Sequence, residues 1–131
     1  MNIGLIAHHS KKKLMQNFCM AYRNILSRNT LYATGTTGRL IEEATNLTVH
    51  KFLAGHLGGE QQMCALIDQN QMDLIIYLRE PLAPHKNDPD VKRIFHSCDT
   101  HNIPLATNLA TAEMMVKSLD RGELDWREMY K

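Results

Sequence analysis

The stretch DLIIYL, from Asp73 to Leu78, decides the fold class of this chain. Its apolar run is unbroken, which is typical of a strand that is buried on both faces. Such strands occur at the centre of parallel sheets whose two faces are covered by helices. The stretch therefore predicts a central strand of an α/β protein.

Short apolar runs alternate with longer amphipathic runs on both sides of this strand. Further strands are expected at Asn2–Ala7, Thr30–Thr34, Val49–Leu53 and Pro104–Ala106. Helices are expected at Lys11–Ser27, Thr37–Thr45, Gly58–Asn70, Asp88–His101 and Ala110–Leu119. This alternation predicts a doubly wound α/β domain with a mostly parallel sheet. The 131 residues are enough for one domain, which we expect to span residues 1–131.

Composition excludes several classes of protein. The formal net charge of +1 argues against a general binder of nucleic acids or membrane surfaces. Neither a signal peptide nor a run long enough to span a bilayer is present, so a cytoplasmic protein is expected. Cys19, Cys64 and Cys98 are odd in number and fall in expected helices, which favours buried thiols over disulfides or a zinc site. Trp126 and Tyr130 in the tail predict that it docks on the body or on a neighbouring subunit.

The chemistry of such a fold is expected at one edge of the sheet. Ligands of open α/β sheets bind beyond the carboxyl ends of the strands. Polar, glycine-rich and ionisable residues follow every expected strand in this sequence. They are His8, His9, Lys12, Thr34, Gly35, Thr36, Thr37, Ala54, Gly55, His56, Glu60, Glu80, His85, Asn87, Asp90, Thr107 and Asn108.

The turn Thr34–Gly38 is the first candidate within this set. A glycine-rich turn from a strand into a helix presents free N–H groups at the positive end of the helix dipole, which suits a phosphate. Lys12 follows the neighbouring strand and can add a full charge. The alternative is a tight turn with an N-cap and no ligand. The spacing matches neither of the standard nucleotide-binding loops.

Glu60 is the second candidate, because it lies in the first turn of the helix that follows Gly58 and Gly59. It either complements the helix dipole or acts as a general base that faces the phosphate site. A carboxylate beside a phosphate cradle indicates proton abstraction next to a carbonyl in a small sugar phosphate. The histidines of this edge lack the spacing of a metal site, so no metal is expected.

Several motifs together resemble the methylglyoxal synthase family. They are IGLIAH at the N-terminus, YATGTTG at Tyr32–Gly38, GxxGGxQQ at Gly55–Gln62, PL…DPDV at Pro81–Val91 and IPLATNxATAE at Ile103–Glu113. The resemblance implies a three-layer α/β/α domain with a five-stranded parallel sheet, assembled as a homohexamer. It also implies a lyase that converts dihydroxyacetone phosphate to methylglyoxal and phosphate without metal or organic cofactor.

The resemblance also assigns roles by position. It implies that Glu60 is the catalytic base and that His8 and Asp90 belong to the catalytic set. It implies substrate or phosphate contacts from His8, Lys12, Thr34, Gly35, Thr36, Thr37, Ala54, Gly55 and Asn87. The resemblance implies that inorganic phosphate is a product, and free phosphate is a natural candidate for an inhibitor because it would occupy the same turn.

The chain departs from the usual residues of the family at several of these positions. Glu60 replaces an aspartate, and a glutamate is a competent base, as in triosephosphate isomerase. Asn87 stands where the family has an active-site histidine, a loss for which other residues could compensate. These residues are His9, His56, Glu80 and His85. Two alternatives therefore stay open: a module that binds phosphorylated metabolites without turnover, and a lyase or isomerase for another sugar phosphate.

Overall fold

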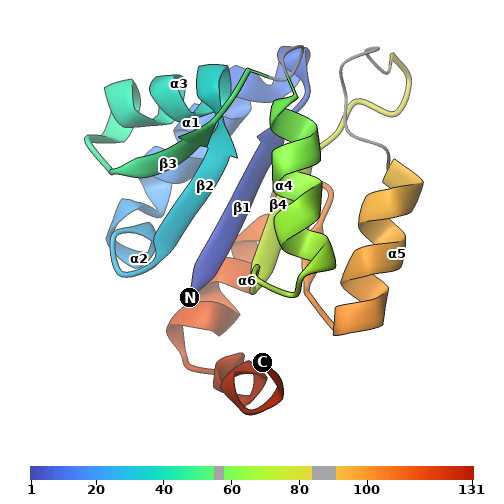
Figure 1. The fold of residues 1–131 in the computed structure, drawn as a ribbon. Coiled ribbons are helices and arrows are strands. Elements are labelled where there is room, and N and C mark those ends of the chain that lie inside the picture. Colours follow the sequence, from blue (N-terminus) through green and yellow to red (C-terminus); the bar gives the residue numbers. More distant parts are fainter. Residues whose placement is uncertain (55–57, 84–90) are drawn as a thin grey trace.

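The computed structural model describes residues 1–54, 58–83 and 91–131. At the centre of the protein lies a five-stranded sheet in the order β3-β2-β1-β4-β5 (Figure 1). All four strand pairs are parallel. The strands are β1 (Asn2–Ala7), β2 (Thr30–Thr34), β3 (Val49–Phe52), β4 (Leu74–Leu78) and β5 (Leu105–Ala106). The helices are η1 (His9–Lys11), α1 (Lys12–Ala21), α2 (Arg23–Leu26), α3 (Gly35–Thr45), α4 (Gly59–Asp68), α5 (Val91–His101), α6 (Leu109–Asp120) and η3 (Asp125–Tyr130), of which η1 and η3 are 3₁₀ helices.

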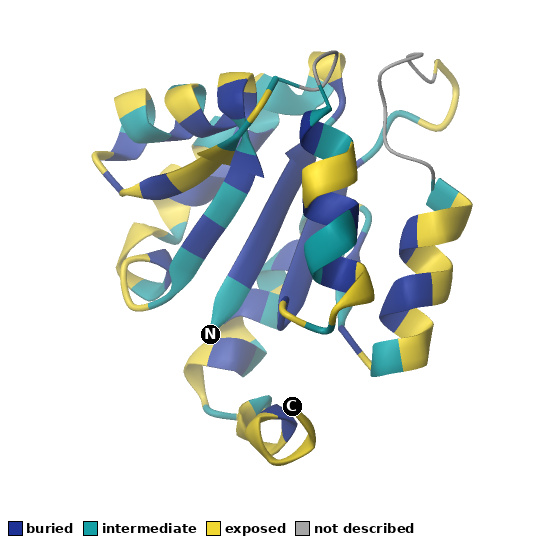
Figure 2. Cartoon of the chain, in the orientation of Figure 1, coloured by how far each residue is buried: buried dark blue, intermediate teal, exposed yellow. Residues whose placement is uncertain are grey.

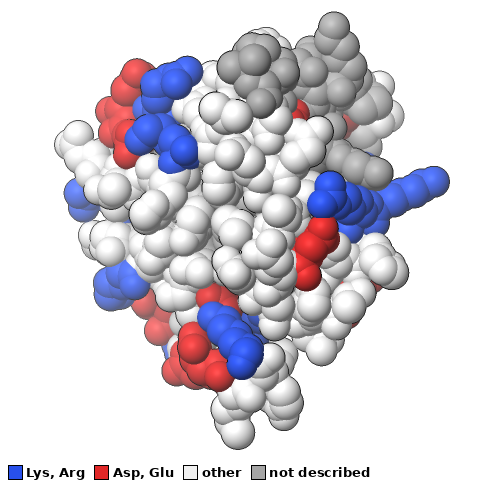
Figure 3. Space-filling model, viewed as in Figure 1, with Lys and Arg blue, Asp and Glu red and all other residues white. Residues whose placement is uncertain are grey.

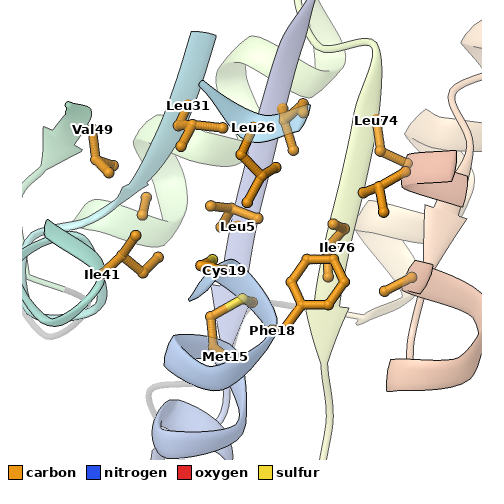
Figure 4. Packing of buried hydrophobic residues seen from close by; sticks show 14 of the residues in the cluster. Leu5, Met15, Phe18, Cys19, Leu26, Leu31, Ile41, Val49, Leu74 and Ile76 are labelled. Atoms are coloured by element: carbon orange, nitrogen blue, oxygen red, sulfur yellow. The ribbon is translucent and has the colours of Figure 1, made fainter. Parts of the chain in front are cut away.

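Helices cover both faces of the sheet and give three layers, as the sequence predicts. Alternate residues of β4 show this arrangement: Leu74 and Ile76 pack into one apolar cluster, and Ile75 and Tyr77 pack into another. The first cluster lies under α1, α2, α3 and α6 (Figure 4), and the second lies under α4 and α5. β1 and β4 are therefore buried along almost their whole length (Figure 2). The unbroken apolar run is explained by burial on both faces.

The helices expected over 11–27 and 37–45 have different bounds in the structure, and α4 and α6 also differ from their expected bounds by one or two residues at each end. The helix expected over 11–27 is interrupted at Tyr22, whose backbone leaves the helical region at φ −109° and ψ 25°. The break redirects the chain so that Leu26 enters the core and the Arg23 guanidinium donates to the carbonyl of Thr45 at 2.6 Å. Apolar periodicity runs through both segments, so it does not detect the interruption. The other helix, α3, starts at Gly35, two residues before the expected position.

The C-terminal segment docks on the body of the same chain through Arg127, whose side chain is 2% exposed. Its guanidinium donates to the Asp73 carboxylate at 3.3 Å and to the Asn70 side chain at 2.7 Å. It also donates to the carbonyls of His101, Asn102 and Met72 at the amino-terminal end of the sheet. These bonds satisfy a buried cation and fix η3 below the strands.

Asp73 is fully buried just before β4, and burial by itself raises the pKa of its carboxyl. Hydrogen bonds from the Lys131 ammonium, the Asn2 backbone N–H and Arg127 outweigh burial, so the pKa lies below its usual value. Lys131 approaches Asp73 at 2.6 Å. The sequence shows this aspartate only as the first letter of an apolar run.

The three thiols are buried, as expected. Burial raises the pKa of Cys19 and, together with the charge of Asp99, that of Cys98 to about 12. Within the described ranges, no three His, Cys, Asp or Glu side chains are grouped as a metal site would require. None of the helices in these ranges has the length and apolar character of a membrane span. Charges of both signs lie next to one another on the face seen in Figure 3.

Candidate functional site

The carboxyl ends of the parallel strands meet at one edge, at the top of Figure 1. The chain changes direction across the sheet between β1 and β4, so the switch point lies between the segments that follow these two strands. His8 donates its backbone N–H to the Leu78 carbonyl at 3.0 Å across this point. The Lys11 ammonium lies 3.5 Å from the Glu80 carboxylate on the same two segments. Glu80, a predicted compensating residue, is therefore held at the switch point by an ion pair.

The predicted phosphate turn is the first turn of α3. β2 ends at Thr34 and the helix begins at Gly35, without an intervening loop. The Thr34 side chain makes no capping hydrogen bond to this turn. The N–H groups of Thr36 and Thr37 have no intrahelical acceptor at these positions. This geometry favours an anion over the alternative of a turn closed by its own N-cap.

Lys12 reaches this turn from the segment that follows the neighbouring strand, β1. It is the first residue of α1, and its ammonium lies 2.9 Å from the Thr37 hydroxyl. Thr37 is buried and Thr36 is exposed, so the two hydroxyls lie on different sides of the turn. The Lys12 ammonium thus adds a full positive charge beside the N-terminus of α3, as the sequence predicts.

Glu60 is brought to the same edge by the two glycines before it. Gly58 has φ +105°, a conformation that favours glycine. A Cβ on Gly59 would lie 1.9 Å from the Leu53 carbonyl oxygen and 3.0 Å from the Thr34 methyl group. The start of α4 thus packs directly against the ends of β3 and β2, next to the first turn of α3. Only a glycine permits this approach.

Gln62, which is not among the predicted site residues, stabilises this contact. Its side-chain oxygen accepts the Leu53 backbone N–H at 2.8 Å, and the Gly59 N–H donates to the Ala54 carbonyl at 3.1 Å. These bonds tie both ends of the segment between β3 and α4 together. The second glutamine of the GGxQQ motif was the available signal for this role.

His8 is buried at the end of β1, with 6% of its surface exposed. Its Nδ1 accepts the Ser10 backbone N–H at 3.0 Å and lies 2.8 Å from the Ser10 hydroxyl oxygen. His9, the next residue, is exposed, so the two adjacent histidines differ in environment.

The structure thus brings most of the described candidates to one edge. They are His8, Lys12, Thr34, Gly35, Thr36, Thr37, Ala54, Glu60 and Glu80. The remaining predicted residues, Gly55, His56, His85, Asn87 and Asp90, lie outside the described residues, as does the helix start expected at Asp88. Thr107 and Asn108 follow β5, and Asn108 caps α6 by accepting the Thr111 N–H at 3.0 Å.

The fold is that of a doubly wound α/β domain. The first turn of α3, with Lys12 beside it, is suited to a small phosphorylated ligand. A family model described as "MGS-like domain" matches residues 15–107, most of the chain. Together with the relatives described next, this match places the chain in the methylglyoxal synthase family.

Relatives with that name match along nearly their whole length. The chain is 61% identical over 129 residues to the methylglyoxal synthase of Caldicellulosiruptor saccharolyticus, covering 98% of this chain and 92% of the relative. It is 53% identical over 131 residues to that of Thermoanaerobacterium thermosaccharolyticum, covering 100% and 98%. A crystal structure of methylglyoxal synthase from Elizabethkingia anophelis has a TM-score of 0.82 and 36% identity over 88% of this chain and 76% of that one.

Proposed function

We propose that this chain catalyses the methylglyoxal synthase reaction, in which dihydroxyacetone phosphate yields methylglyoxal and inorganic phosphate. The proposal is supported by the close approach of Gly59 to Leu53 and Thr34, since Glu60 follows Gly59 and Thr34 precedes the first turn of α3. Lys12 lies beside the same turn, with its ammonium 2.9 Å from the Thr37 hydroxyl. Membership of a family whose relatives carry this name supports the same reaction.

The first step requires that the phosphate group be held in place. The N–H groups of Thr36 and Thr37 and the Lys12 ammonium supply donors and positive charge for its oxygens. Thr34 and Gly35 shape the turn, and Gly35 leaves little room for a side chain, because a Cβ there would lie 3.1 Å from the Phe52 carbonyl oxygen. The start of α3 can therefore lie close to the end of β3.

The second step is removal of a proton. The Glu60 carboxylate takes a proton from the carbon beside the carbonyl, and the electron pair of that C–H bond forms an enediolate. His8 stabilises the oxygen that becomes negative. The bond between carbon and the phosphate oxygen then breaks, and phosphate leaves with the electron pair of this C–O bond. The enol product tautomerises to methylglyoxal. Gly55, Ala54, Asn87 and Asp90 are proposed as further contacts by their position in the family pattern.

The test is a product assay on the full chain. Purified protein is incubated with dihydroxyacetone phosphate, and methylglyoxal and phosphate are measured together; equal amounts of both are expected. Protein whose melting temperature rises with phosphate but which releases neither product would contradict the proposal and favour the binding module. Turnover of a tetrose or pentose phosphate in preference to the triose would favour a lyase or isomerase for another sugar phosphate.

The assembly and compartment follow from the same proposal. We propose a homohexamer of single-domain chains in the cytoplasm, without metal or organic cofactor, and with free phosphate as a competitive inhibitor. Light scattering of the purified protein tests the assembly, and initial rates at several phosphate concentrations test the inhibition. A monomer that is fully active, or rates that do not depend on phosphate, would contradict these two points.

A further inference from the structure

The Ser10 contact decides where the His8 imidazole carries its proton. A backbone N–H can only donate, so Nδ1 of His8 must accept the bond from the Ser10 N–H. A neutral imidazole has one N–H and one acceptor nitrogen, so its proton lies on Nε2. The Ser10 hydroxyl, 2.8 Å from Nδ1, can rotate to donate to the same nitrogen. Both contacts therefore favour one tautomer.

We propose that Ser10 is a positioning residue that holds His8 in the Nε2–H tautomer, so that this N–H donates to the carbonyl oxygen of the substrate. The inference rests on the proposed function. Its chemical consequence is a division of roles, because Nε2 then has no free electron pair with which to remove a proton. His8 stabilises the enediolate oxygen, and Glu60 alone acts as the base. A neutral histidine beside a glutamate base serves triosephosphate isomerase in the same way.

The location of both residues supports this role. η1 follows β1, and His8 is its N-cap, so the backbone of His8 is fixed by its bond to Leu78 and the ring is held by Ser10. This position is at the switch point, next to the strand that leads to the phosphate turn. Ser10 is exposed, so its truncation leaves both apolar clusters intact.

The first test reads the tautomer directly. Full-length protein labelled with ¹⁵N in histidine is studied by NMR, and the His8 signals are assigned by their loss in His8→Gln. We expect the pattern of a protonated Nε2 and an unprotonated Nδ1. A protonated Nδ1, or averaging between the two tautomers, would overturn the inference. Addition of dihydroxyacetone phosphate to labelled Glu60→Gln should shift the Nε2 signal, and an unchanged signal would also overturn it.

The second test is kinetic. Ser10→Ala removes the hydroxyl but keeps the backbone N–H, so we expect kcat to fall by about fivefold with little change in KM. Ser27→Ala is the matched control, since Ser27 is also exposed and its hydroxyl donates to the Asn24 carbonyl at the end of α2, away from the switch point. An unchanged kcat in Ser10→Ala would contradict the positioning role. A protein without turnover that keeps the expected His8 pattern would instead count against the proposed function alone.

Discussion

The close approach of α4 to β3 gives the sharpest prediction, because Gly59→Ala forces these elements apart. The new Cβ would lie 1.9 Å from the Leu53 carbonyl oxygen, whereas ordinary contacts lie at 3.4–4 Å. The obstacle is backbone, which cannot rotate away, so the start of α4 must move by roughly 1.5 Å. Glu60 moves with it, and a displacement of about 1 Å in such a site costs about 10²-fold in rate. We expect kcat to fall by at least about 10²-fold.

The assay is the initial rate of methylglyoxal formation, together with urea unfolding of the same variant. Overpacking should reduce the free energy of unfolding by about 1–3 kcal/mol, which leaves the protein folded at 25 °C. Gly122→Ala is the control, because its φ of +79° also disfavours a side chain but lies next to η3, at the opposite end of the sheet. It should lose stability and keep its rate. A folded Gly59→Ala with a wild-type rate would refute the proposed location of the base.

Three further predictions concern other contacts. Lys12→Ala removes the cation beside the phosphate turn, so KM should rise about 10- to 100-fold in initial-rate assays; an unchanged KM would place the lysine outside the site. Gln62→Ala loses the bond that closes the segment before α4, and its kcat should fall about fivefold, whereas Gln62→Glu keeps an acceptor oxygen and should retain most of the rate; equal kcat values would contradict this. Burial raises the pKa of the Asp73 carboxyl, but the bonds from Lys131, the Asn2 backbone N–H and Arg127 together lower it by more, so the pKa in the folded protein lies below its usual value. The stability that these bonds contribute is therefore complete above about pH 4 and is lost as the pH falls below the usual pKa of about 3.9. The melting temperature of the wild type should therefore decline below about pH 4, and Arg127→Met should lower the free energy of unfolding at pH 7 by about 3 kcal/mol; a wild-type value would contradict the buried pair.

The sequence predicts those parts of the fold that depend on local patterns. β1 and β2 have the expected bounds, and the buried run of β4 identifies the centre of the sheet. Patterns fail where the deciding contact is distant in the sequence. The break at Tyr22 depends on how Leu26 and Arg23 meet other elements, and apolar periodicity carries no record of such contacts.

The same limit applies to the candidate site. The glycines before Glu60 and the turn after Thr34 could be identified from residue type and spacing, and the structure brings them together. The hydrogen bonds of Ser10 and Gln62 could not be predicted, because residue type and spacing do not show which nitrogen of His8 or which backbone N–H is the partner. Asp73 was missed for a related reason, since its partners Arg127 and Lys131 lie more than fifty residues away in the sequence.

The central claim is that Glu60 removes the substrate proton at this edge of the sheet. The most direct test compares kcat for dihydroxyacetone phosphate in the wild type and in Glu60→Gln, with melting temperature and phosphate affinity measured on both. A general base contributes about 10²–10⁴-fold, so we predict a loss of that size with an unchanged melting temperature and retained phosphate binding. A Glu60→Gln variant that keeps the wild-type rate would contradict the claim.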